Sequence, residues 1–280
     1  MSATAMTELP ELRDAHESSR LGVYLRELYE RRSYINHVAT NELKSRQITN
    51  VLGNFWHLLN PALSIAVYYL IFGLLLDTGR TENFILFLTV GLFIYQTTQK
   101  STTDGAKAIV TNKGVIKAVR FPRALLPISS TWTEFLASFP NYLVIFTMAM
   151  LTGVAPRWSW LALVPLALLQ LVFNTGAAMI AARLTTHFVD MIQILPFVFR
   201  LLFYGSGVIF SVEAYVESDS AVSLLFELNP LYAFVTLARW SVMGGGFEPL
   251  LLLSATVWSL ILLVFGFFWF RAAEETYARD

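Results

Sequence analysis

The side chains of this sequence that could carry chemistry are charged or polar groups set within long apolar stretches. Glu134 and Arg200 are charged, and a charge in apolar surroundings is costly unless it faces a partner or an aqueous path. Tyr204 follows Arg200 by four residues. On a helix the two therefore share a face, which pairs a cation suited to a diphosphate with a ring suited to a sugar. The alternative is that Arg200 extends to water or pairs with Glu134, which leaves Tyr204 as packing.

The sequence holds none of the common arrangements of a nucleotide or enzyme site. There is no G-x-x-x-x-G-K-[ST] phosphate loop, Gly205-Ser206-Gly207 is not a nucleophile elbow, and the four histidines lack metal-ligand spacing. The absence of cysteine excludes disulfides and thiolate metal sites. We therefore expect no catalytic residue, metal or cofactor in this chain. The amides in the apolar stretches are expected to hydrogen-bond neighbouring helices: Asn141, Gln170, Asn174 and Gln193.

Composition places the elements that carry these side chains in a membrane. Hydrophobic residues make up 55% of the chain and charged residues 14%, far from the balance of a soluble domain. Twenty acidic and twenty basic residues cancel, so no global charge recruits nucleic acid. We predict an all-α integral membrane protein, because six stretches approach the ~20 residues that span a bilayer. These six transmembrane helices are expected at Phe55 to Leu76, Asn83 to Gln99, Ile128 to Leu151, Leu161 to Leu184, Met191 to Phe210 and Pro249 to Phe270.

The basic residues indicate how these helices cross. Sixteen Lys and Arg residues fall in the predicted inner segments and only Arg80, Arg157 and Arg239 in the outer ones, which follows the positive-inside rule. The first 50 residues are polar and lack the apolar core of a signal peptide, so we expect the N-terminus in the cytoplasm. Six spans then place the C-terminus there too. We expect a tail with an interfacial helix in residues 1–50, a six-span domain in 51–270 and a tail in 271–280.

Two segments on the predicted cytoplasmic side look like helices outside the bilayer. Near the N-terminus, apolar residues from Leu21 to Leu28 repeat at helical spacing between charged ones, which indicates a helix on the membrane surface or, equally, one packed against a partner. The segment from Lys100 to Pro127 is basic but too apolar for a free loop. Interruptions at Gly114 and at Phe121-Pro122 predict two short helices that form either a docking surface or an anchor for anionic lipids.

On the outer side, Asn229-Pro230 is a good helix start, with an asparagine cap and a proline in the first turn. The apolar run that follows ends at a triple glycine and is too short to cross, so we expect a re-entrant helical segment there. Aromatic residues in the spans could line a path for sugars, although interface belts and core packing are their usual roles. The candidates are Tyr68, Tyr69, Phe72, Phe93, Tyr95, Trp132, Phe199, Phe203 and Tyr204.

Three stretches of the sequence resemble a known family. These are LGNFWHLLNPALSIAVYYLIFGLLL from Leu52, NKGVIKAVRFPRALLPISS from Asn112 and NPLYAFVTLARW from Asn229. They are similar to the ABC-2 permeases of polysaccharide export, which include exporters of O-antigen, teichoic acid and mycobacterial galactan, the last being the preferred match. Many members carry Arg-Asp before the fifth span, whereas this chain has Val189-Asp190, which weakens any role tied to that arginine.

The resemblance implies a homodimer in the bacterial inner membrane, docked to two copies of a separate ATPase subunit that binds ATP and Mg²⁺. It implies a gate helix that contains Leu21, Tyr24, Leu25, Leu28, Arg31 and Arg32. It implies ATPase-coupling contacts at Asp104, Lys107, Asn112, Lys113, Ile116, Arg120, Phe121, Pro122, Arg123 and Asp190. Together with the aromatic candidates, it suggests a substrate path along Tyr68, Tyr69, Phe72, Tyr95, Trp132, Arg200 and Tyr204.

The implied activity is transport without chemistry on the substrate. A lipid-linked glycan would enter near the gate helix and thread between two subunits as the ATPases cycle. Two other classes compete with this interpretation. An exporter of a small drug or a lipid would share the fold. A membrane enzyme acting on polyprenyl phosphates would need clustered acids on one cytoplasmic loop, whereas the inner loops hold only Asp104 and Asp190.

Overall fold

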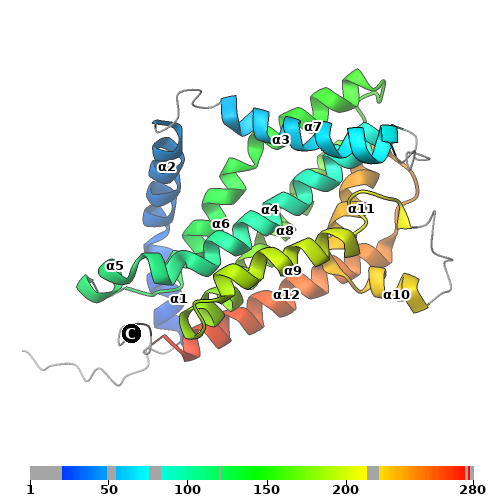
Figure 1. Ribbon diagram of the computed structural model, residues 1–280. Helices are drawn as coiled ribbons and strands as arrows, with labels where there is room; N and C mark the ends of the chain where they lie inside the picture. The colour runs from blue at the N-terminus through cyan, green and yellow to red at the C-terminus, as the bar shows by residue number, and fades with distance from the viewer. Residues whose placement is uncertain are drawn as a thin grey trace, which may run out of the picture.

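The computed structural model describes residues 21–48, 55–75, 83–119, 121–212, 221–274 and 277 of the chain. Every regular element in these ranges is a helix. Figure 1 shows α4 (Phe84–Thr111), α8 (Leu163–His187), α9 (Met191–Gly205) and α12 (Pro249–Ala272) running alongside one another. At one end α2 (Arg32–Ile48) lies crosswise near α5 (Lys113–Ala118), and at the other end lie α10 (Ala221–Glu227) and α11 (Pro230–Met243). The protein is therefore a helical bundle with helices at both ends.

Three helical segments of the described chain are long and apolar enough to cross a membrane. They are Leu125–Leu151, Trp158–His187 and Pro249–Ala272. The first consists of α6 (Leu125–Ala137) and α7 (Phe139–Leu151), which meet at Ser138 just before a proline. The second begins with a 3₁₀ turn, η2 (Trp158–Ala162), and continues as α8. These segments match three of the six predicted spans to within a few residues.

The remaining predicted spans correspond to apolar helices of other lengths. α3 (Phe55–Tyr68) continues into a π-helix, η1 (Tyr69–Leu75), and α9 has 15 residues with a proline inside. α4 runs for 28 residues, so the second predicted span extends as one helix into the segment expected to be cytoplasmic. An all-helical architecture with several apolar helices, as expected of a membrane protein, is therefore confirmed for the described residues.

The break before α5 lies at Asn112, so the predicted interruption at Gly114 was wrong. The Asn112 side-chain amide donates to the Ala108 carbonyl at 2.8 Å and its backbone N–H donates to the Ile109 carbonyl. Asparagine favours such local bonds to the backbone, which compete with continued helix. Gly114 instead sits inside α5 with open space around it, where a glycine is tolerated at a modest cost.

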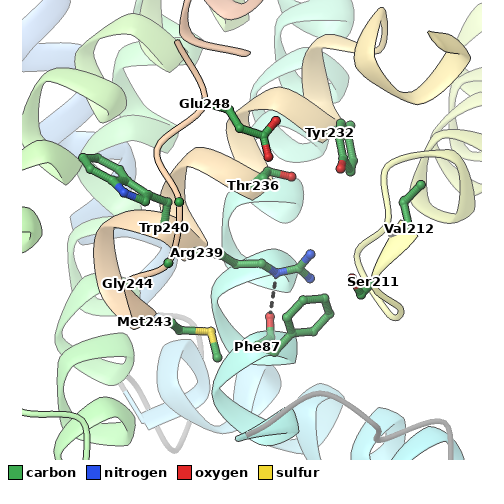
Figure 2. A pocket seen from close by; sticks show the side chains of 12 residues that line it. Phe87, Ser211, Val212, Tyr232, Thr236, Arg239, Trp240, Met243, Gly244 and Glu248 are labelled. Carbon is green, nitrogen blue, oxygen red and sulfur yellow. Dashed lines mark hydrogen bonds between the residues drawn. The ribbon is translucent and has the colours of Figure 1, made fainter. Parts of the chain in front are cut away.

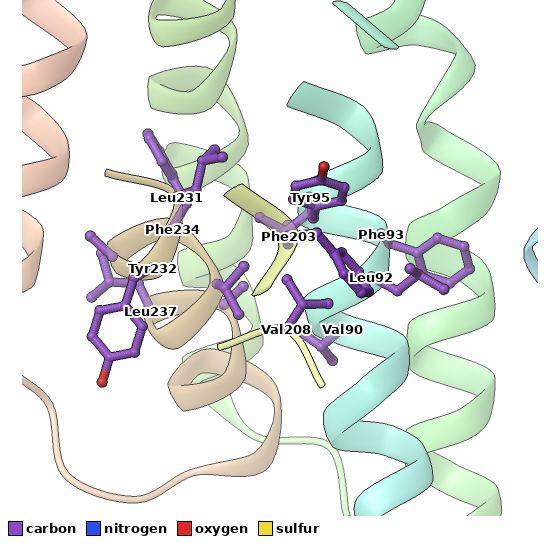
Figure 3. Close-up of a cluster of buried hydrophobic side chains, with 14 of the residues drawn as sticks. Val90, Leu92, Phe93, Tyr95, Phe203, Val208, Leu231, Tyr232, Phe234 and Leu237 are labelled. Atoms are coloured by element: carbon purple, nitrogen blue, oxygen red, sulfur yellow. The ribbon is translucent and has the colours of Figure 1, made fainter. Parts of the chain in front are cut away.

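The main core is built around the first half of α4, residues 84–98, where nearly every side chain is buried. The second half carries Lys100, which is exposed, and Asp104 and Lys107, which are half-buried. Figure 3 shows side chains of α4, α9, α11 and the turn after α9 meeting in the core. Tyr95 packs edge-on against Phe203 with their ring centroids 5.1 Å apart, and Val208 and Phe234 are fully buried in the same cluster. This core fixes the outer helix α11 to the bundle.

α8 and α12 approach so closely that only glycine fits at their crossing. A Cβ added to Gly176 would lie 2.3 Å from the backbone carbon of Leu262, and one added to Gly266 would lie 2.6 Å from the Gly176 carbonyl oxygen. Small residues that bring backbones together are typical of helix pairs within membranes. The predicted role is confirmed for two of the four amides, while Gln193 is exposed. Gln170 of α8 donates to the Ile94 carbonyl of α4 at 2.8 Å. Asn174 of α8 likewise donates to Ser101 of α4.

Candidate functional site

The N-terminal residues form two helices, α1 (Leu21–Glu30) and α2, with a break at Arg31. Of the predicted gate-helix residues, Tyr24 is buried and Leu28 packs beside it. Leu21, Leu25, Arg31 and Arg32 are exposed. The predicted apolar stripe therefore divides into an inward pair one turn apart and an outward pair, and only the inward pair anchors α1 to the bundle.

A charged cluster that sequence reasoning missed links α2 to α4 and α6, and we call it the Arg46 cluster. Arg46 pairs with Glu134 of α6 at 2.5 Å, with Glu42 of its own helix at 2.8 Å and with Asp104 of α4 at 3.4 Å. The suggested alternative of a pair between Arg200 and Glu134 was wrong, because Glu134 is engaged by Arg46. The one local signal was Glu42 four residues before Arg46, a spacing typical of an exposed helix pair.

The predicted coupling segment presents one apolar face inward and another outward. Ile116 of α5 is 5% exposed, whereas Val115 and Val119 on either side are 43% and 55% exposed. Lys113, Lys107 and Asp104 are half-buried on the same stretch. Arg120 lies outside the described residues. The outward face of this end of the chain is therefore Val115 and Val119, beside the exposed Lys117.

The residues after α5 join the N- and C-terminal segments in what we call the base cluster, built from Tyr24, Ile116, Phe270, Tyr277 and their neighbours. Phe121 packs against this cluster and Pro122 is buried. The backbone N–H of Arg123 donates to the Glu274 carboxylate at 2.6 Å, and the N–H of Ala124 donates to the Tyr24 hydroxyl at 3.4 Å. Burial raises the pKa of the Glu274 carboxyl and, together with that carboxylate, the pKa of Tyr24.

The other predicted ATPase contact, Asp190, lies in the turn between α8 and α9. Phe188, Val189 and Asp190 are all exposed there. Two large apolar side chains exposed in one short turn, 67% and 56% for Phe188 and Val189, suit contact with another surface. This gives Asp190 an accessible position, in contrast to the buried Ile116.

The aromatic residues proposed for a substrate path fall into different environments. Tyr95 is buried, with its hydroxyl donating to the Phe199 carbonyl, so it belongs to the core. Tyr68 packs on Phe203, with their ring centroids 5.3 Å apart. The other three contact neighbouring side chains: Phe72 stacks on Tyr68, Tyr69 stacks on Phe84 of α4, and the Trp132 indole N–H donates to Asn36 of α2 at 3.2 Å.

Arg200 and Tyr204 share an exposed face of α9, as their spacing predicted. Tyr204 is 51% exposed, and Leu201 and Phe197 nearby are 75% and 65% exposed. The guanidinium carbon of Arg200 lies 5.7 Å from the Phe197 ring centroid, within reach of a cation–π contact. The face is therefore largely apolar with one cation and one phenol, and it is open to lipid, to a second subunit or to a substrate.

Near α11 a second site, which we call the outer cavity, holds about 540 Å³. Figure 2 shows Thr236, Tyr232 and Glu248 around it, with the guanidinium of Arg239 below them. Arg239 is 8% exposed and donates to the carbonyls of Phe87, Gly207 and Val208 at 3.1, 2.8 and 2.7 Å. It therefore ties α11 to α4 and to the turn after α9. From its position in the sequence alone, Arg239 is predicted only as a basic residue of an outer segment.

The start of α11 is held as its sequence predicts. The Asn229 side chain accepts from the Leu231 N–H at 3.0 Å and donates to the Gly205 carbonyl at 2.8 Å. Pro230 occupies the first turn and the helix ends at Gly244, whose φ is +88°. A left-handed φ of this kind favours glycine, so the predicted bounds of the outer helix are confirmed.

Comparison with known proteins decides the family. The model of the family described as ABC-2 type transporter matches residues 36–243, most of the bundle including the Arg46 cluster and α11. This chain belongs to the ABC-2 type transporter family. It is a membrane transport subunit and not an enzyme, so the alternative of a polyprenyl-phosphate enzyme is not favoured.

Individual relatives carry names from polysaccharide export. The chain is 30% identical over 262 residues to the O-antigen export system permease protein RfbA of Myxococcus xanthus, covering 91% of this chain and 98% of that protein. It is 29% identical over 247 residues to the protein of the same name from Klebsiella pneumoniae, covering 86% and 92%. It is 24% identical over 241 residues to the polysialic acid transport protein KpsM of Escherichia coli, covering 84% and 91%.

Proposed function

We propose that this chain is the membrane-spanning subunit of an exporter that moves a lipid-linked polysaccharide across the bacterial inner membrane. The observation that carries the proposal is the similarity over nearly the full chain to O-antigen export permeases. The relatives named here carry O-antigen or polysialic acid in their names. That the glycan of this chain is a galactan stays a prediction.

The proposed assembly is a homodimer with two copies of a separate ATP-binding subunit, which would hold ATP and Mg²⁺. Six membrane crossings with both ends in the cytoplasm follow from the six apolar helices and from the excess of basic residues in the predicted inner segments. In that orientation α2 and α5 would face the cytoplasm together with Asp190. Figure 1 shows α11 at the other end of the bundle from α2 and α5, so α11 would lie on the outer side.

ATPase docking is proposed at Val115 and Val119 of the α5 segment and at Phe188 to Asp190. These positions supply exposed apolar contacts next to charged residues on short segments at the cytoplasmic end. The α5 segment is anchored to the bundle by Ile116, which packs in the base cluster. Through this contact a movement of the ATPase could be transmitted to α1 and α4.

The substrate path is proposed along the exposed face of α9 that carries Arg200 and Tyr204. In a homodimer an apolar face of this kind would meet its counterpart, and the arginine would then be positioned to contact the diphosphate of a lipid carrier. The tyrosine ring offers a weak contact to sugars passing along it. The exposure of both side chains supports a role outside the core.

The test is to deplete the chain in its native cells and to identify which lipid-linked glycan accumulates in the inner leaflet. Complementation with Arg200→Ala and Tyr204→Ala, with pull-down of the ATPase as a control for assembly, then examines the path. Lost export with intact assembly supports a lining role. Normal cell-surface glycan after depletion would refute the proposed export, and normal export by both variants would refute the proposed path.

A further inference from the structure

The outer cavity contains polar groups that the packing of α11 does not use. Helical threonines in this chain commonly donate their hydroxyl to a carbonyl one turn earlier, as Thr89, Thr97 and Thr256 do at 2.7, 2.9 and 2.8 Å. Within the described residues Thr236 donates no hydrogen bond to the protein. Figure 2 shows its side chain beside the carboxylate of Glu248, on the cavity side of α11. The hydroxyl is therefore available to a bound molecule.

Arg239 brings donors to the same space. A guanidinium has five N–H groups, and three of those of Arg239 are engaged by backbone carbonyls. The remaining two belong to its terminal nitrogens, and the side chain lines the cavity. Because Arg239 is held in place by carbonyls and by the Phe87 ring, 3.3 Å from its guanidinium carbon, these donors are fixed before any ligand arrives.

The cavity also has ring faces and a size suited to a small ligand. Tyr232 and Trp240 contribute aromatic walls, and Ser211 adds a further hydroxyl-bearing side chain. A volume of about 540 Å³ lies within the usual range of small-molecule sites, which combine apolar walls with a few convergent polar groups. Figure 2 shows that these side chains lie on α11, on the turn after α9 and on the segment before α12.

The combination of charges selects among ligand classes. A simple anion would meet the carboxylate of Glu248, and a simple cation would meet the guanidinium of Arg239. A ring that bears several hydroxyls satisfies both, because each hydroxyl can accept from the arginine or donate to the carboxylate. Its C–H faces can rest on the aromatic walls. The set of side chains therefore matches a neutral sugar better than a phosphate or an amine.

We propose that the outer cavity binds a sugar residue of the exported glycan, which gives the chain a second glycan contact at the outer end, apart from the face that carries Arg200 and Tyr204. This inference rests on the proposed export of a polysaccharide. It assigns contacts with the sugar to the Thr236 hydroxyl, the Glu248 carboxylate and the two spare N–H groups of Arg239, whose other N–H groups position α11.

The experiment uses the permease with its ATPase subunit in lipid nanodiscs. The probe is the lipid-free polysaccharide released from the native cells by mild acid, and its affinity is measured by calorimetry. Thr236→Val removes the hydroxyl at nearly constant shape, Thr236→Ser restores it, and Thr256→Val is the matched deletion outside the cavity. Gly246→Phe places a bulky ring at a residue that lines the cavity, and it removes no side-chain hydrogen bond and causes no clash at the Cβ, which meets nothing within 4 Å.

We expect Thr236→Val to weaken glycan binding several-fold, up to about tenfold for one lost hydrogen bond, and Gly246→Phe to abolish it. Thr236→Ser and Thr256→Val should bind as the wild type does. Equal binding by Gly246→Phe and the wild type would overturn the inference, even if Thr236→Val is unstable. If the wild type exports the glycan in cells but the purified complex does not bind the probe, the inference fails and the proposed function stands. Unchanged export after depletion refutes both.

Discussion

Arg46 and Glu134 form an ion pair between α2 and α6, with a guanidinium nitrogen 2.5 Å from a carboxylate oxygen. The Glu134 side chain is 4% exposed and that of Arg46 33%. The pair therefore joins a buried carboxylate within a predicted span to a half-buried cation on the crosswise N-terminal helix. Because Arg46 also reaches Asp104 of α4, one side chain connects the N-terminal helix with two helices of the bundle.

Arg46→Ala should lower the free energy of unfolding by roughly 1–3 kcal/mol. Breaking a fully buried pair costs about 3–5 kcal/mol because a charge is left unpaired, and the partial exposure of Arg46 reduces this. Thermal melting of the detergent-solubilised protein measures the change. Arg26→Ala is the matched control, since its pair with Glu30 is exposed on both sides and should be nearly neutral.

A double variant separates the pair from its surroundings. Arg46→Ala combined with Glu134→Gln removes the buried charge as well, so its loss of stability should be smaller than the sum of the two single losses. Strict additivity, or an Arg46→Ala protein as stable as Arg26→Ala, would show that solvent rather than Arg46 satisfies Glu134.

Gly91→Ala should destabilise the attachment of α11 to α4. A Cβ at Gly91 would lie 2.4 Å from a terminal nitrogen of Arg239, so the guanidinium must leave its carbonyl acceptors or the helices must separate. Overpacking of this kind costs about 1–3 kcal/mol. Gly22→Ala provides the control, because Gly22 has nothing within 4 Å of its Cβ position and alanine is the better helix former. A Gly91→Ala protein that melts like the control contradicts the close fit of Arg239.

The stability of the base cluster should depend on the protonation of Glu274. Burial raises the pKa of this carboxyl in the folded protein, so the folded state binds its proton more tightly than the unfolded state does. The stabilisation from protonation is complete below the unfolded pKa, about 4.3, and is lost as the pH rises through the folded pKa. Above that pH the protein holds a partly buried carboxylate whose acceptor role for Arg123 remains.

Glu274→Gln keeps an acceptor for the Arg123 N–H and removes the titration. The melting temperature of the wild type should therefore fall relative to that of Glu274→Gln as the pH is raised from about 4 to 7, where the wild-type carboxyl loses its proton. Glu30→Gln is a control on an exposed side chain of α1. Parallel pH profiles for the wild type and Glu274→Gln would show that the carboxyl titrates as it does in the unfolded chain.

The membrane helices and the start of α11 could be predicted because their signals are local. A long apolar run stays apolar whichever partner it meets, and the Asn229-Pro230 cap acts within one turn. Which face a short helix buries, in contrast, is decided by residues that are distant in the sequence. Ile116 and Val119 are similar side chains three residues apart, and the base cluster formed by residues far along the chain determines that Ile116 is the buried one.

The polar sites could not be predicted from the sequence because their partners are distant. Arg46 and Glu134 are 88 residues apart, and Arg239 bonds to Phe87, 152 residues away. Charge count and spacing place such residues on a side of the membrane without showing what they contact. The outer cavity has the same origin, since its walls come from α4, α11 and two connecting segments.

The two faces of α5 provide the test of ATPase coupling. Val119→Asp places a charge on the exposed side, where the fold has no need of an apolar residue, so the purified subunit should melt like the wild type. If α5 docks on the ATPase, the same charge enters an apolar interface without a partner, which costs on the order of a few kcal/mol. Binding of the ATPase should then weaken at least tenfold and export should stop.

Ile116→Asp is the contrasting variant, because Ile116 lies in the base cluster. Burying an unpaired carboxylate there should unfold or loosen the cytoplasmic end, which lowers the melting temperature of the isolated subunit before any ATPase is added. Pull-down of the ATPase and thermal melting together separate the outcomes. Val119→Asp should fail only in the pull-down and Ile116→Asp in both. Normal ATPase binding by a stable Val119→Asp subunit would show that docking does not use this face of α5.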